Sequence, residues 1–589
     1  MSGILCNAIR RAGSEVLSSV KPPGLKTVNP CLKVQEAQRG CRQLQQGFRQ
    51  FSSNRIPETF KPPQEIKKLP MDALFVINRS PNARNTTVEQ IRGMGGSWAK
   101  QLTIVEARQD GRPITPSSNL PLDFYGPASW DDFEKMSRSL DNFFLKNPSF
   151  NNSKNAVYYP WCEQAESPEH ARFWESKGFH WVGISADVLE RQTKANFKKT
   201  CIDLGIPTSP FIELGLNTAE KSSKDPDLIR KAADHFTKEL LDNAPPVFFE
   251  EGCFVKLDGG GGRGSRGIDA ETMKDQAAIT EAINAIINEN NGSWDGLYAE
   301  GLVGAEGLLK QYEFEVQGTR NIGQPLADKL LSPDTDSCRI LNQSTASVRE
   351  VAFTNRKKVI EQSYTEAQAL HMYGEEVLEL KKQARVLADA LGNDNRATVE
   401  VLKAGKNISF LELNARIQVE HMADAILSML KGEKGIYPVV VPGLQIMASY
   451  GFPAPNPDQD YEPIPGKEFS LHVRLVNSDL DSDGNLIYKT GTVEGAHLPY
   501  ADEIFLNKGD IHSDSDPQFG CAVYTAPTHE EVTTKAARSL MEGSVYGKGI
   551  DGNWLPNLPR LLSDERHVGL KEFDANDPIK IMNDKGEDN

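Results

Sequence analysis

The residues with the clearest chemical potential belong to a predicted β-hairpin in the last third of the chain. Two strand-like segments, 396–402 and 408–414, flank a plausible turn. If they pair around that turn, Glu400 faces Glu412, and Asn414 lies next along the same face. Opposed carboxylates repel each other unless a cation neutralises them, and such oxygen ligands suit Mg²⁺ or Mn²⁺. The hairpin therefore predicts a metal site, against the alternative of two solvated glutamates on an exposed sheet face.

The opposite face of the same hairpin is apolar. A turn centred near Lys406, within the turn segment 403–407, pairs Val399 with Leu413 and Val401 with Leu411. The alternation of apolar and polar residues is typical of a strand pair with one buried face.

A polar run follows the second strand. If residues 416–421 are extended, Arg416, Gln418 and Glu420 lie on the metal-facing side. A cation, an amide and a carboxylate could bind a small oxyanion and remove its proton. The alternative for this trio is a surface ion pair, and we expect His421 to be structural.

A glycine-rich loop with flanking cations forms a second candidate site. Gly259, Gly260, Gly261 and Gly262 are followed by Arg263, Gly264 and Arg266, and Lys256 lies on the strand-like segment before them. Consecutive glycines leave backbone N–H groups open to phosphate oxygens, and the cations add charge. No Gly-Lys-Ser/Thr follows, so this is not a Walker A loop. We predict phosphate binding, with a flexible surface loop as the alternative.

The elements that must position these residues are alternating strands and helices followed by a smaller α+β segment, 466–560. The strand-like segments are 73–77, 102–105, 157–159 and 181–184, and the helical ones are 87–92, 168–177, 186–204, 273–289 and 365–391. Strands that alternate with helices predict an α/β domain with a parallel sheet covered on both faces.

Composition and charge exclude several classes of protein. The 589 residues are 39% hydrophobic and 25% charged, which is ordinary for a globular chain of several domains. Residues 1–55 carry nine Lys or Arg and two acidic residues, which leaves a charge of −22 on the rest of a chain whose total is −15. We therefore expect no bulk nucleic-acid binding. We also expect no membrane span, since no apolar run approaches about 18 residues.

The basic segment 1–55 resembles a mitochondrial presequence. Arg49-Gln50-Phe51 followed by Ser52-Ser53 is similar to a matrix processing site. The expected location is the mitochondrial matrix, with an unaddressed basic tail as the alternative. The eight cysteines form no CxxC pair, so we expect neither a disulfide framework nor a zinc site.

From about Phe75 to about Asp551 the chain resembles biotin carboxylases, of the ATP-grasp superfamily. The run Glu412-Leu413-Asn414-Ala415-Arg416-Ile417-Gln418-Val419-Glu420-His421 closely resembles their active-site signature, and the glycine loop resembles their phosphate-covering lid. The resemblance implies an ATP-grasp fold with an N-terminal parallel-sheet domain and a C-terminal α+β domain.

The resemblance also implies roles for single residues. Lys194 and Lys256 match ATP-binding lysines, and the segment from Glu300 to Val303 resembles the hinge that meets the adenine. Glu400, Glu412 and Asn414 match the metal-binding positions. Lys358 matches a lysine that helps to hold bicarbonate, Glu420 the base that deprotonates it, Arg416 the catalytic arginine, and Arg474 the arginine that stabilises the biotin enolate. The implied mechanism is in-line attack of bicarbonate on the γ-phosphate of ATP, giving carboxyphosphate, whose decarboxylation delivers carbon dioxide to biotin.

Three positions depart from the family pattern. Glu313 stands where the family usually has a histidine, Arg356 replaces a second histidine, and Phe353 replaces a glutamine. The glycine loop is also one residue short. These changes concern the regions that hold nucleotide and biotin.

The predicted organisation follows from these segments. It comprises a presequence at 1–55, a linker at 56–70, an α/β domain at 71–190, an ATP-grasp domain at 191–465 with a lid at about 211–302, a C-terminal domain at 466–560 and a tail at 561–589. No Met-Lys-Met biotin-attachment sequence occurs, so biotin is expected in trans on a carrier or carboxyltransferase protein. Dimers are common in the family, and a homodimer is possible.

Three functions remain open. The first is a biotin-carboxylase-type enzyme that uses ATP, magnesium and bicarbonate. The second is an ATP-grasp ligase that joins another carboxylate to an amine or other nucleophile. The third is a non-catalytic ATP-binding subunit of a larger carboxylase, which the facing carboxylates disfavour because of their repulsion.

Overall fold

Within the 589-residue chain, the computed structural model describes residues between 61 and 562, with gaps. The described residues are 61, 66, 69–77, 87–88, 90–92, 102–109, 123–127, 129–152, 154–214, 222–257, 265–290, 292–294, 296–301, 309–320, 348–354, 357–364, 368, 370–371, 374–418, 426–456, 459–480, 486–506, 509–511, 518–550 and 562. The predicted presequence at 1–55 lies outside them.

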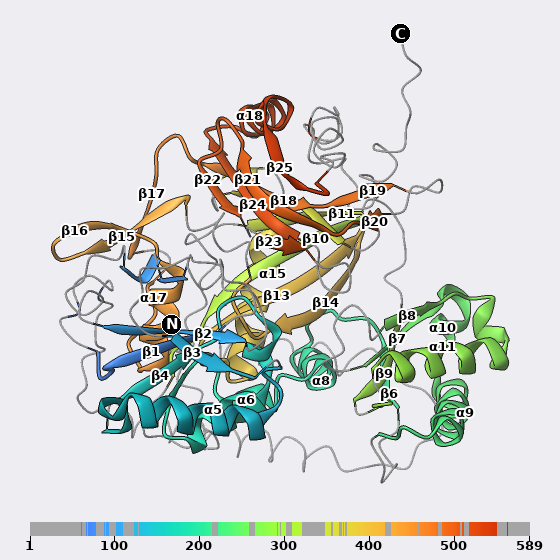
Figure 1. Ribbon diagram of the computed structural model, residues 1–589. Coiled ribbons are helices and arrows are strands. Elements are labelled where there is room, and N and C mark those ends of the chain that lie inside the picture. Colours follow the sequence, from blue (N-terminus) through green and yellow to red (C-terminus); the bar gives the residue numbers. More distant parts are fainter. Residues whose placement is uncertain are drawn as a thin grey trace, which may run out of the picture. The chain divides into compact units, whose positions relative to one another are not determined.

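A five-stranded parallel sheet begins the described chain. Its order is β3 (Asp123–Gly126), β2 (Thr103–Gln109), β1 (Ala73–Ile77), β4 (Asn155–Tyr158) and β5 (His180–Val182). The predicted parallel sheet and its strands are confirmed. Helices α5 (Phe133–Lys146) and α6 (Pro168–Ser176) lie on one side of this sheet, and α17 (Val441–Ser449) lies on the other (Figure 1).

The central strand β1 is buried on both faces. Ala73, Phe75 and Ile77 pack with residues of α5 and α6, whereas Leu74 and Val76 join a second cluster with Ile446 and Met447 of α17. Alternate side chains of a strand point to opposite faces, so an unbroken apolar run is required here.

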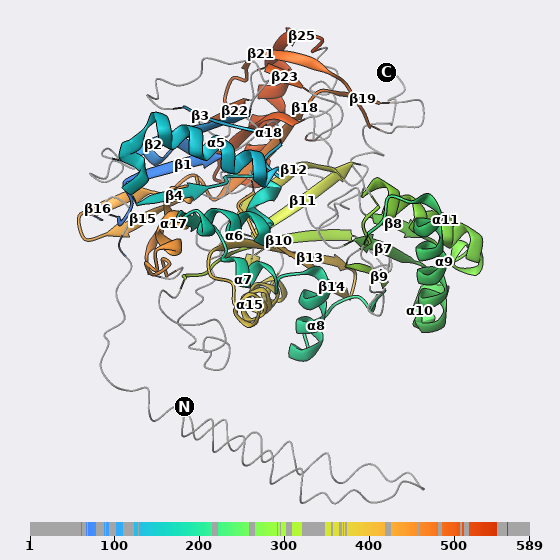
Figure 2. The same cartoon turned by 60° about the horizontal axis from the view of Figure 1, so that its bottom comes forward.

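The main sheet has eight strands, all antiparallel. Its order is β14 (Asn407–Asn414), β13 (Arg396–Ala404), β10 (Leu309–Gln317), β11 (Val348–Thr354), β12 (Lys357–Tyr364), β18 (Phe469–Val476), β24 (Gln518–Ala526) and β22 (Glu503–Leu506). Three strands of the predicted α+β segment at 466–560, namely β18, β24 and β22, thus continue the sheet that carries the hairpin. Helix α18 (His529–Glu542) packs on β18 and β24 (Figure 2).

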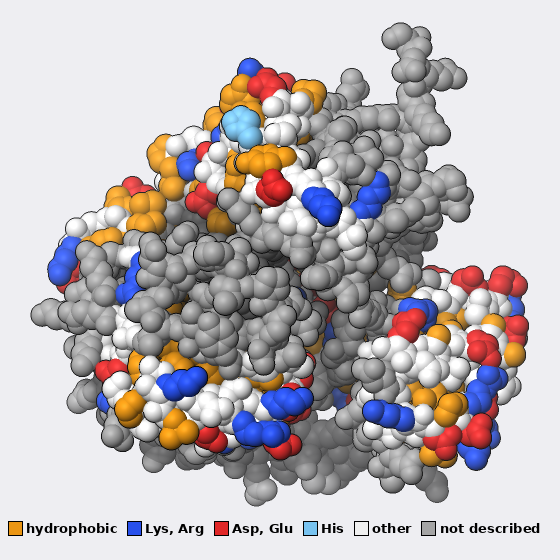
Figure 3. All heavy atoms as spheres, in the orientation of Figure 1, with side chains coloured by type: hydrophobic (Ala, Val, Ile, Leu, Met, Phe, Trp, Pro, Cys, Tyr) orange, Lys and Arg blue, Asp and Glu red, His pale blue; other side chains and the backbone are white. Residues whose placement is uncertain are grey.

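The predicted lid region is an α+β unit with its own core. Strands β6 (Phe211–Glu213), β9 (Leu297–Gly301), β7 (Cys253–Leu257) and β8 (Ser265–Ile268) form its sheet, with α9 (Pro226–Asn243), α10 (Pro246–Glu251), a 3-10 turn at Thr272–Lys274 and α11 (Gln276–Glu289). Its buried residues form a separate cluster that includes Phe236, Val255 and Ile283. Figure 3 shows acidic and basic side chains intermixed over this unit.

The remaining elements complete the described chain. They are the 3-10 turns Pro148–Asn152 and Glu163–Glu166, α7 (Ala186–Leu189), α8 (Lys194–Leu204), α15 (Glu375–Ala390), and strands β15 (Ser428–Gly432), β16 (Gly435–Pro438), β17 (Tyr461–Pro463), β19 (Ser478–Leu480), β20 (Leu486–Tyr488), β21 (Gly491–His497), β23 (Gly509–Ile511) and β25 (Ser544–Lys548).

Two predicted helices differ in extent. The helix predicted over 186–204 is two helices, α7 and α8, because Thr193 is extended (φ −66°, ψ 153°) and its side chain caps α8 by accepting a hydrogen bond from the Asn196 N–H. The helix predicted over 365–391 has its long described part in α15, after Gly374 at φ +71°. Capping residues, which the apolar periodicity does not reveal, determine both boundaries.

A short link joins the segment after α8 to β14. The Phe410 N–H donates to the Pro207 carbonyl oxygen at 3.0 Å, and the Ser209 N–H donates to Ser409 Oγ at 2.9 Å. The Gly301 N–H donates to the Pro210 carbonyl oxygen at 2.8 Å. The hairpin, the segment between α8 and β6, and the end of β9 are therefore neighbours.

Gly205 ends α8 in the left-handed region, at φ +68°, and no atom lies within 4 Å of the position that an added Cβ would take. We expect Gly205→Ala to lower the free energy of unfolding by about 1 kcal/mol, through backbone strain alone. The midpoint of urea unfolding measures it. Asp203→Ala, at an exposed position of the same helix, is the control and should change little. Equal midpoints for the two variants would contradict the assignment of this C-cap.

Candidate active site

The two predicted metal-binding glutamates face each other. Glu400 of β13 pairs with Glu412 of β14, and Val399 pairs with Leu413, as expected. Glu400 is buried, and each of its carboxylate oxygens accepts an amide hydrogen bond: Asn414 Nδ2 donates at 2.8 Å and Gln311 Nε2 at 3.1 Å. The predicted trio Glu400, Glu412 and Asn414 is thus brought together by one hairpin.

The predicted pairing of Val401 with Leu411 is wrong. Val401 pairs with Phe410, and a register shift lies between Glu400 and Val401. The turn is centred between Gly405 and Lys406, not on Lys406, because Ala404 pairs with Asn407. A β-bulge absorbs the difference of one residue, so the glutamate pairing is as predicted although the turn centre is not.

A third carboxylate extends this row. Glu313 of β10 pairs directly with Glu400, so three glutamates lie side by side across β10, β13 and β14. Glu313 is buried at 1% exposure, and Gln311 Nε2 donates to its Oε1 at 3.3 Å. The departure noted at Glu313 therefore lies beside the predicted metal ligands and makes that surface more negative.

The first predicted ATP lysine reaches the hairpin. Lys194 is the first residue of α8, directly after the Thr193 cap, and its Nζ lies 2.8 Å from Glu412 Oε2. Both side chains are about three-quarters buried, at 23% and 26% exposure. The ammonium neutralises part of the charge of the facing carboxylates.

The second predicted ATP lysine is held by Glu300. Lys256 of β7 forms an ion pair with the Glu300 carboxylate of β9, and Lys198 Nζ lies 3.0 Å from the other oxygen, Oε2. Burial raises the pKa of Glu300, but the two lysines outweigh burial and hold its pKa below the ordinary value. The Glu300 side chain thus contacts lysines, and its backbone pairs with Phe211 and Phe254.

Sequence reasoning missed Lys198. Its side chain is fully buried on α8, one turn after Lys194. A lysine in a helical segment is normally exposed, and the residues that enclose it come from other parts of the chain. The one available signal is the four-residue spacing from Lys194, which puts both lysines on one face of the helix.

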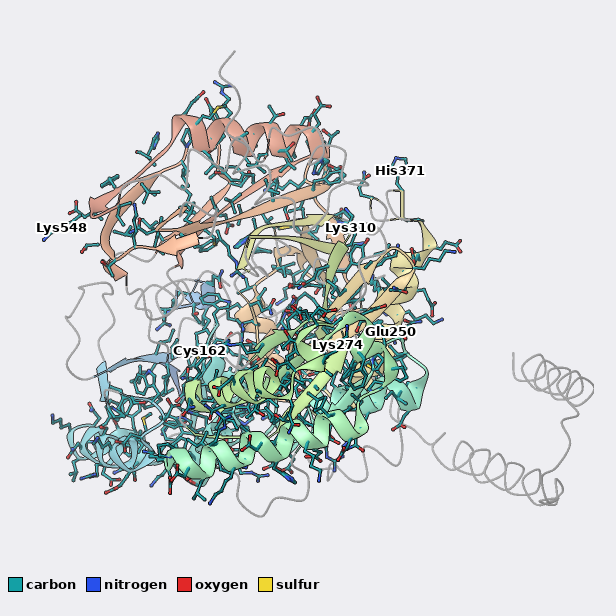
Figure 4. All side chains as sticks on the ribbon, turned by 90° about the vertical axis from the view of Figure 1, so that its right-hand side faces the viewer. Cys162, Glu250, Lys274, Lys310, His371 and Lys548 are labelled. Carbon is teal, nitrogen blue, oxygen red and sulfur yellow. The ribbon has the colours of Figure 1, made fainter. Side chains whose placement is uncertain are left out.

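The predicted catalytic arginine contacts the first sheet's loop. The chain bends at Arg416 after β14 ends, and Arg416 Nε lies 3.5 Å from Glu166 Oε1. Cys162, labelled in Figure 4, lies in the same loop, and burial raises the pKa of its thiol to about 12 while the nearby Arg416 opposes the rise. A thiol with that pKa is protonated at neutral pH and is no nucleophile.

Two further predicted residues lie on neighbouring strands. Lys358 is on β12, where it pairs with Phe353 of β11, and β12 pairs with β18, which carries Arg474 opposite Cys521. The other predicted residues fall outside the described part of the chain: Gly259, Gly260, Gly261, Gly262, Arg263, Gly264, Val303 and Glu420, with Arg356 and His421.

Two negative findings apply to the described residues alone. Among them, no three His, Cys, Asp or Glu side chains are gathered closely enough to hold a metal ion by themselves. A cation at the hairpin would therefore need ligands from Asn414 and from the substrate. In the same part of the chain, no helix combines the length and hydropathy needed to cross a membrane.

No protein-family model matches the chain, and no curated protein sequence matches it. Solved structures do. The biotin carboxylase domain dimer of Hydrogenobacter thermophilus 2-oxoglutarate carboxylase, in complex with MgADP, ADP and bicarbonate, is 18% identical, with 87% of this chain and 98% of that chain covered and a TM-score of 0.61. Biotin carboxylase from Campylobacter jejuni is 15% identical, with 86% and 98% covered and a TM-score of 0.61.

Pyruvate carboxylase from Rhizobium etli is a longer protein, part of which is similar in structure to this chain. It is 18% identical, with 88% of this chain but 41% of that chain covered and a TM-score of 0.62. At these identities the likeness shows the fold, which is that of biotin carboxylase domains with their ATP-grasp architecture.

The hairpin geometry predicts a measurable metal dependence. In the presence of ADP, added Mg²⁺ should raise the melting temperature above the value with ADP alone. Glu400→Gln and Glu412→Gln should each raise the Mg²⁺ concentration needed for half of this increase by about tenfold, because each removes an anionic ligand. Thermal melting across a Mg²⁺ titration measures it.

Glu376→Gln is the matched control for that titration. Glu376 lies beside the same hairpin, 2.9 Å from Lys403 Nζ, and is half-exposed. Identical Mg²⁺ midpoints for all three variants and the unmodified protein would contradict the assignment of the hairpin as a metal site.

Proposed function

On the biotin-carboxylase type of ATP-grasp fold, we propose that this chain is a ligase that uses ATP to activate bicarbonate as carboxyphosphate and carboxylates biotin on a partner protein. The observation that carries the proposal is the hairpin in which Glu400 faces Glu412, with Asn414 hydrogen-bonded to Glu400 and Lys194 ion-paired to Glu412. A fold alone does not specify chemistry, and this arrangement supports the proposal because its oxygen donors suit a metal ion that also binds phosphate.

The donors present fit a magnesium ion. They are two carboxylates and the Asn414 amide oxygen, which the hydrogen bond from Asn414 Nδ2 to Glu400 does not use. Oxygen donors of this kind are those that Mg²⁺ or Mn²⁺ prefers, with phosphate oxygens as further ligands. When bound, the ion screens the phosphate charge so that an anionic nucleophile can approach.

The lysines complete the phosphate site. Lys194 would exchange its contact with Glu412 for the phosphates once a metal ion neutralises that carboxylate. Lys256 extends from β7, just before the glycine loop Gly259–Gly264, whose backbone N–H groups would cover the phosphates.

Bicarbonate would bind beside Arg416, with Lys358 as a second cation and Glu420 as the base. The bicarbonate oxygen would attack the γ-phosphorus of ATP in line, ADP would leave, and the proton would pass to Glu420. Arg474 would stabilise the enolate of the biotin that accepts the carboxyl group. The bicarbonate in the Hydrogenobacter thermophilus domain supports this choice of substrate.

Biotin would arrive in trans. No Met-Lys-Met segment occurs within the 589 residues. We therefore propose a separate carrier or carboxyltransferase partner. The dimer of the Hydrogenobacter thermophilus domain supports a homodimer for this chain as well.

A second function is favoured by one observation. Glu313 is buried directly beside Glu400, where the resembling family usually has a histidine. An extra carboxylate next to the phosphates would alter how the nucleotide is held, and it suits a ligase that transfers another acyl phosphate to an amine or other nucleophile.

Phosphate release from ATP distinguishes the two functions. With Mg²⁺ present, release by the mature protein should depend on bicarbonate and rise when free biotin is added. Glu420→Gln should lower it by at least about 100-fold, since the general base is lost. Glu433→Gln, an exposed glutamate beyond the signature, is the control and should keep full activity.

Each other outcome has a defined meaning. Release that is indifferent to bicarbonate would contradict the carboxylase and favour the second ligase. No release, together with measurable ATP binding, would contradict both enzymes and favour a non-catalytic ATP-binding subunit.

We further propose that the chain acts in the mitochondrial matrix. The support is the arginine-rich, acid-poor segment 1–55 with its Arg49-Gln50-Phe51 run. Deletion of residues 1–51 should abolish import into isolated mitochondria, measured by protease protection, while fusion of those residues to a cytosolic reporter should direct its import. Unchanged import of the chain that lacks residues 1–51 would contradict the assignment of this segment as a mitochondrial presequence.

A further inference from the structure

A buried lysine outside the predicted site makes contacts with three elements that surround it. Lys198 of α8 has no exposed side-chain surface, and its Nζ lies 2.9 Å from the Phe410 carbonyl oxygen, 3.2 Å from Ser209 Oγ and 3.0 Å from Glu300 Oε2. An ammonium group has three protons, and here three oxygen atoms are within reach of them.

These contacts suit the protonated form of the lysine, which carries the charge that the Glu300 carboxylate pairs with. Nζ donates a hydrogen bond to the Phe410 carbonyl oxygen and forms an ion pair with the Glu300 carboxylate. Burial lowers the pKa of Lys198, but the Glu300 charge opposes that effect. A buried charge is costly unless it is paired, which explains why this lysine has an anionic partner.

The other end of the Glu300 carboxylate holds Lys256. The order of contacts is Lys198, Glu300, Lys256, and the carboxylate lies between two cations. Glu300 is 3% exposed, whereas the Lys256 side chain is 24% exposed. The three charged groups thus extend from the buried Lys198 to the more exposed Lys256, which lies on the strand before the glycine loop.

We infer that Lys198 is a positioning residue for nucleotide binding: its buried ammonium fixes the Glu300 carboxylate, which orients Lys256 towards the phosphates. The inference rests on the proposed function only in taking Lys256 as a phosphate ligand. In this role Lys198 acts through Glu300 and does not itself contact the nucleotide.

The geometry favours this role over simple filling of space. An apolar side chain of similar length would fill the site without a desolvation cost, and such replacements of buried ion pairs are often neutral or stabilising. Lys198 instead bonds β14 through Phe410, two residues before Glu412, and the segment before β6 through Ser209. The Lys198 ammonium therefore contacts both the hairpin strand that carries Glu412 and the Glu300 carboxylate that holds Lys256.

The role predicts a pH dependence when Lys198 is removed. The charged groups that face Glu300 are Lys198 from α8 and Lys256 from β7; Cys201, near Lys198, has a thiol pKa of about 12 and stays neutral. With both lysines, Glu300 is ionised throughout pH 6 to 8. Without Lys198, burial is opposed by one cation fewer, so the pKa of Glu300 rises and the carboxylate is lost as pH falls through it.

The experiment is titration of ADP with Mg²⁺ into the full chain by isothermal calorimetry at pH 8, 7 and 6. Lys198→Met should weaken ADP binding by about tenfold at pH 8, because one charge-assisted contact is lost, and by more at pH 6. The unmodified protein should show little change across this range. Lys199→Met is the matched control: it removes the next lysine of α8, which is half-exposed and pairs with Glu213, and it should bind ADP as the unmodified protein does.

Should Lys198→Met fail to fold, Lys198→Met combined with Glu300→Gln removes both buried charges. The inference then predicts weak ADP binding with no pH dependence, since no titratable group remains to hold Lys256. Unchanged ADP affinity in a folded Lys198→Met or double variant would overturn the inference and leave the proposed function standing. Failure of the unmodified protein to bind ADP would overturn both.

Discussion

The repulsion between Glu400 and Glu412 is the constraint on which the rest of the site depends. The hairpin forces the two carboxylates into register, and Glu313 adds a third on the next strand. Like charges so placed are destabilising unless donors or cations surround them. The amides of Asn414 and Gln311 and the ammonium of Lys194 meet this need in the structure. A metal ion with a bound phosphate would meet it more fully, and its binding would then stabilise the folded chain.

The fold supplies these countercharges from separate elements. Lys194 comes from the start of α8, and Lys198, one turn later, reaches the same strand β14 through the Phe410 carbonyl. The Glu300 carboxylate pairs with Lys198 and also with Lys256 on β7. The eight-stranded sheet, the helix and the lid sheet therefore meet at a short series of alternating charges, and a nucleotide placed there would contact the ends of that series.

Much of this could be predicted because it depends on local pattern. The alternation of glutamate and asparagine with valine and leucine predicted the pairing of Glu400 with Glu412, and the apolar run 73–77 predicted a buried strand. The bulge beside Val401 could not be predicted, since it depends on whether the turn centres on one residue or between two. Nor could the role of Lys198, whose partners are 11, 102 and 212 positions away in the chain. Contacts between distant segments leave little trace in local periodicity.

We propose that this site joins bicarbonate to the γ-phosphate of ATP. Supplying ¹⁸O-labelled bicarbonate with ATP and Mg²⁺, and analysing the released phosphate by mass spectrometry, tests it most directly. If a bicarbonate oxygen attacks phosphorus, that oxygen stays with the phosphate when the carbon–oxygen bond later breaks, so each phosphate should carry one labelled oxygen. Unlabelled phosphate would mean that water or another nucleophile attacks ATP, and it would contradict the formation of carboxyphosphate at this site.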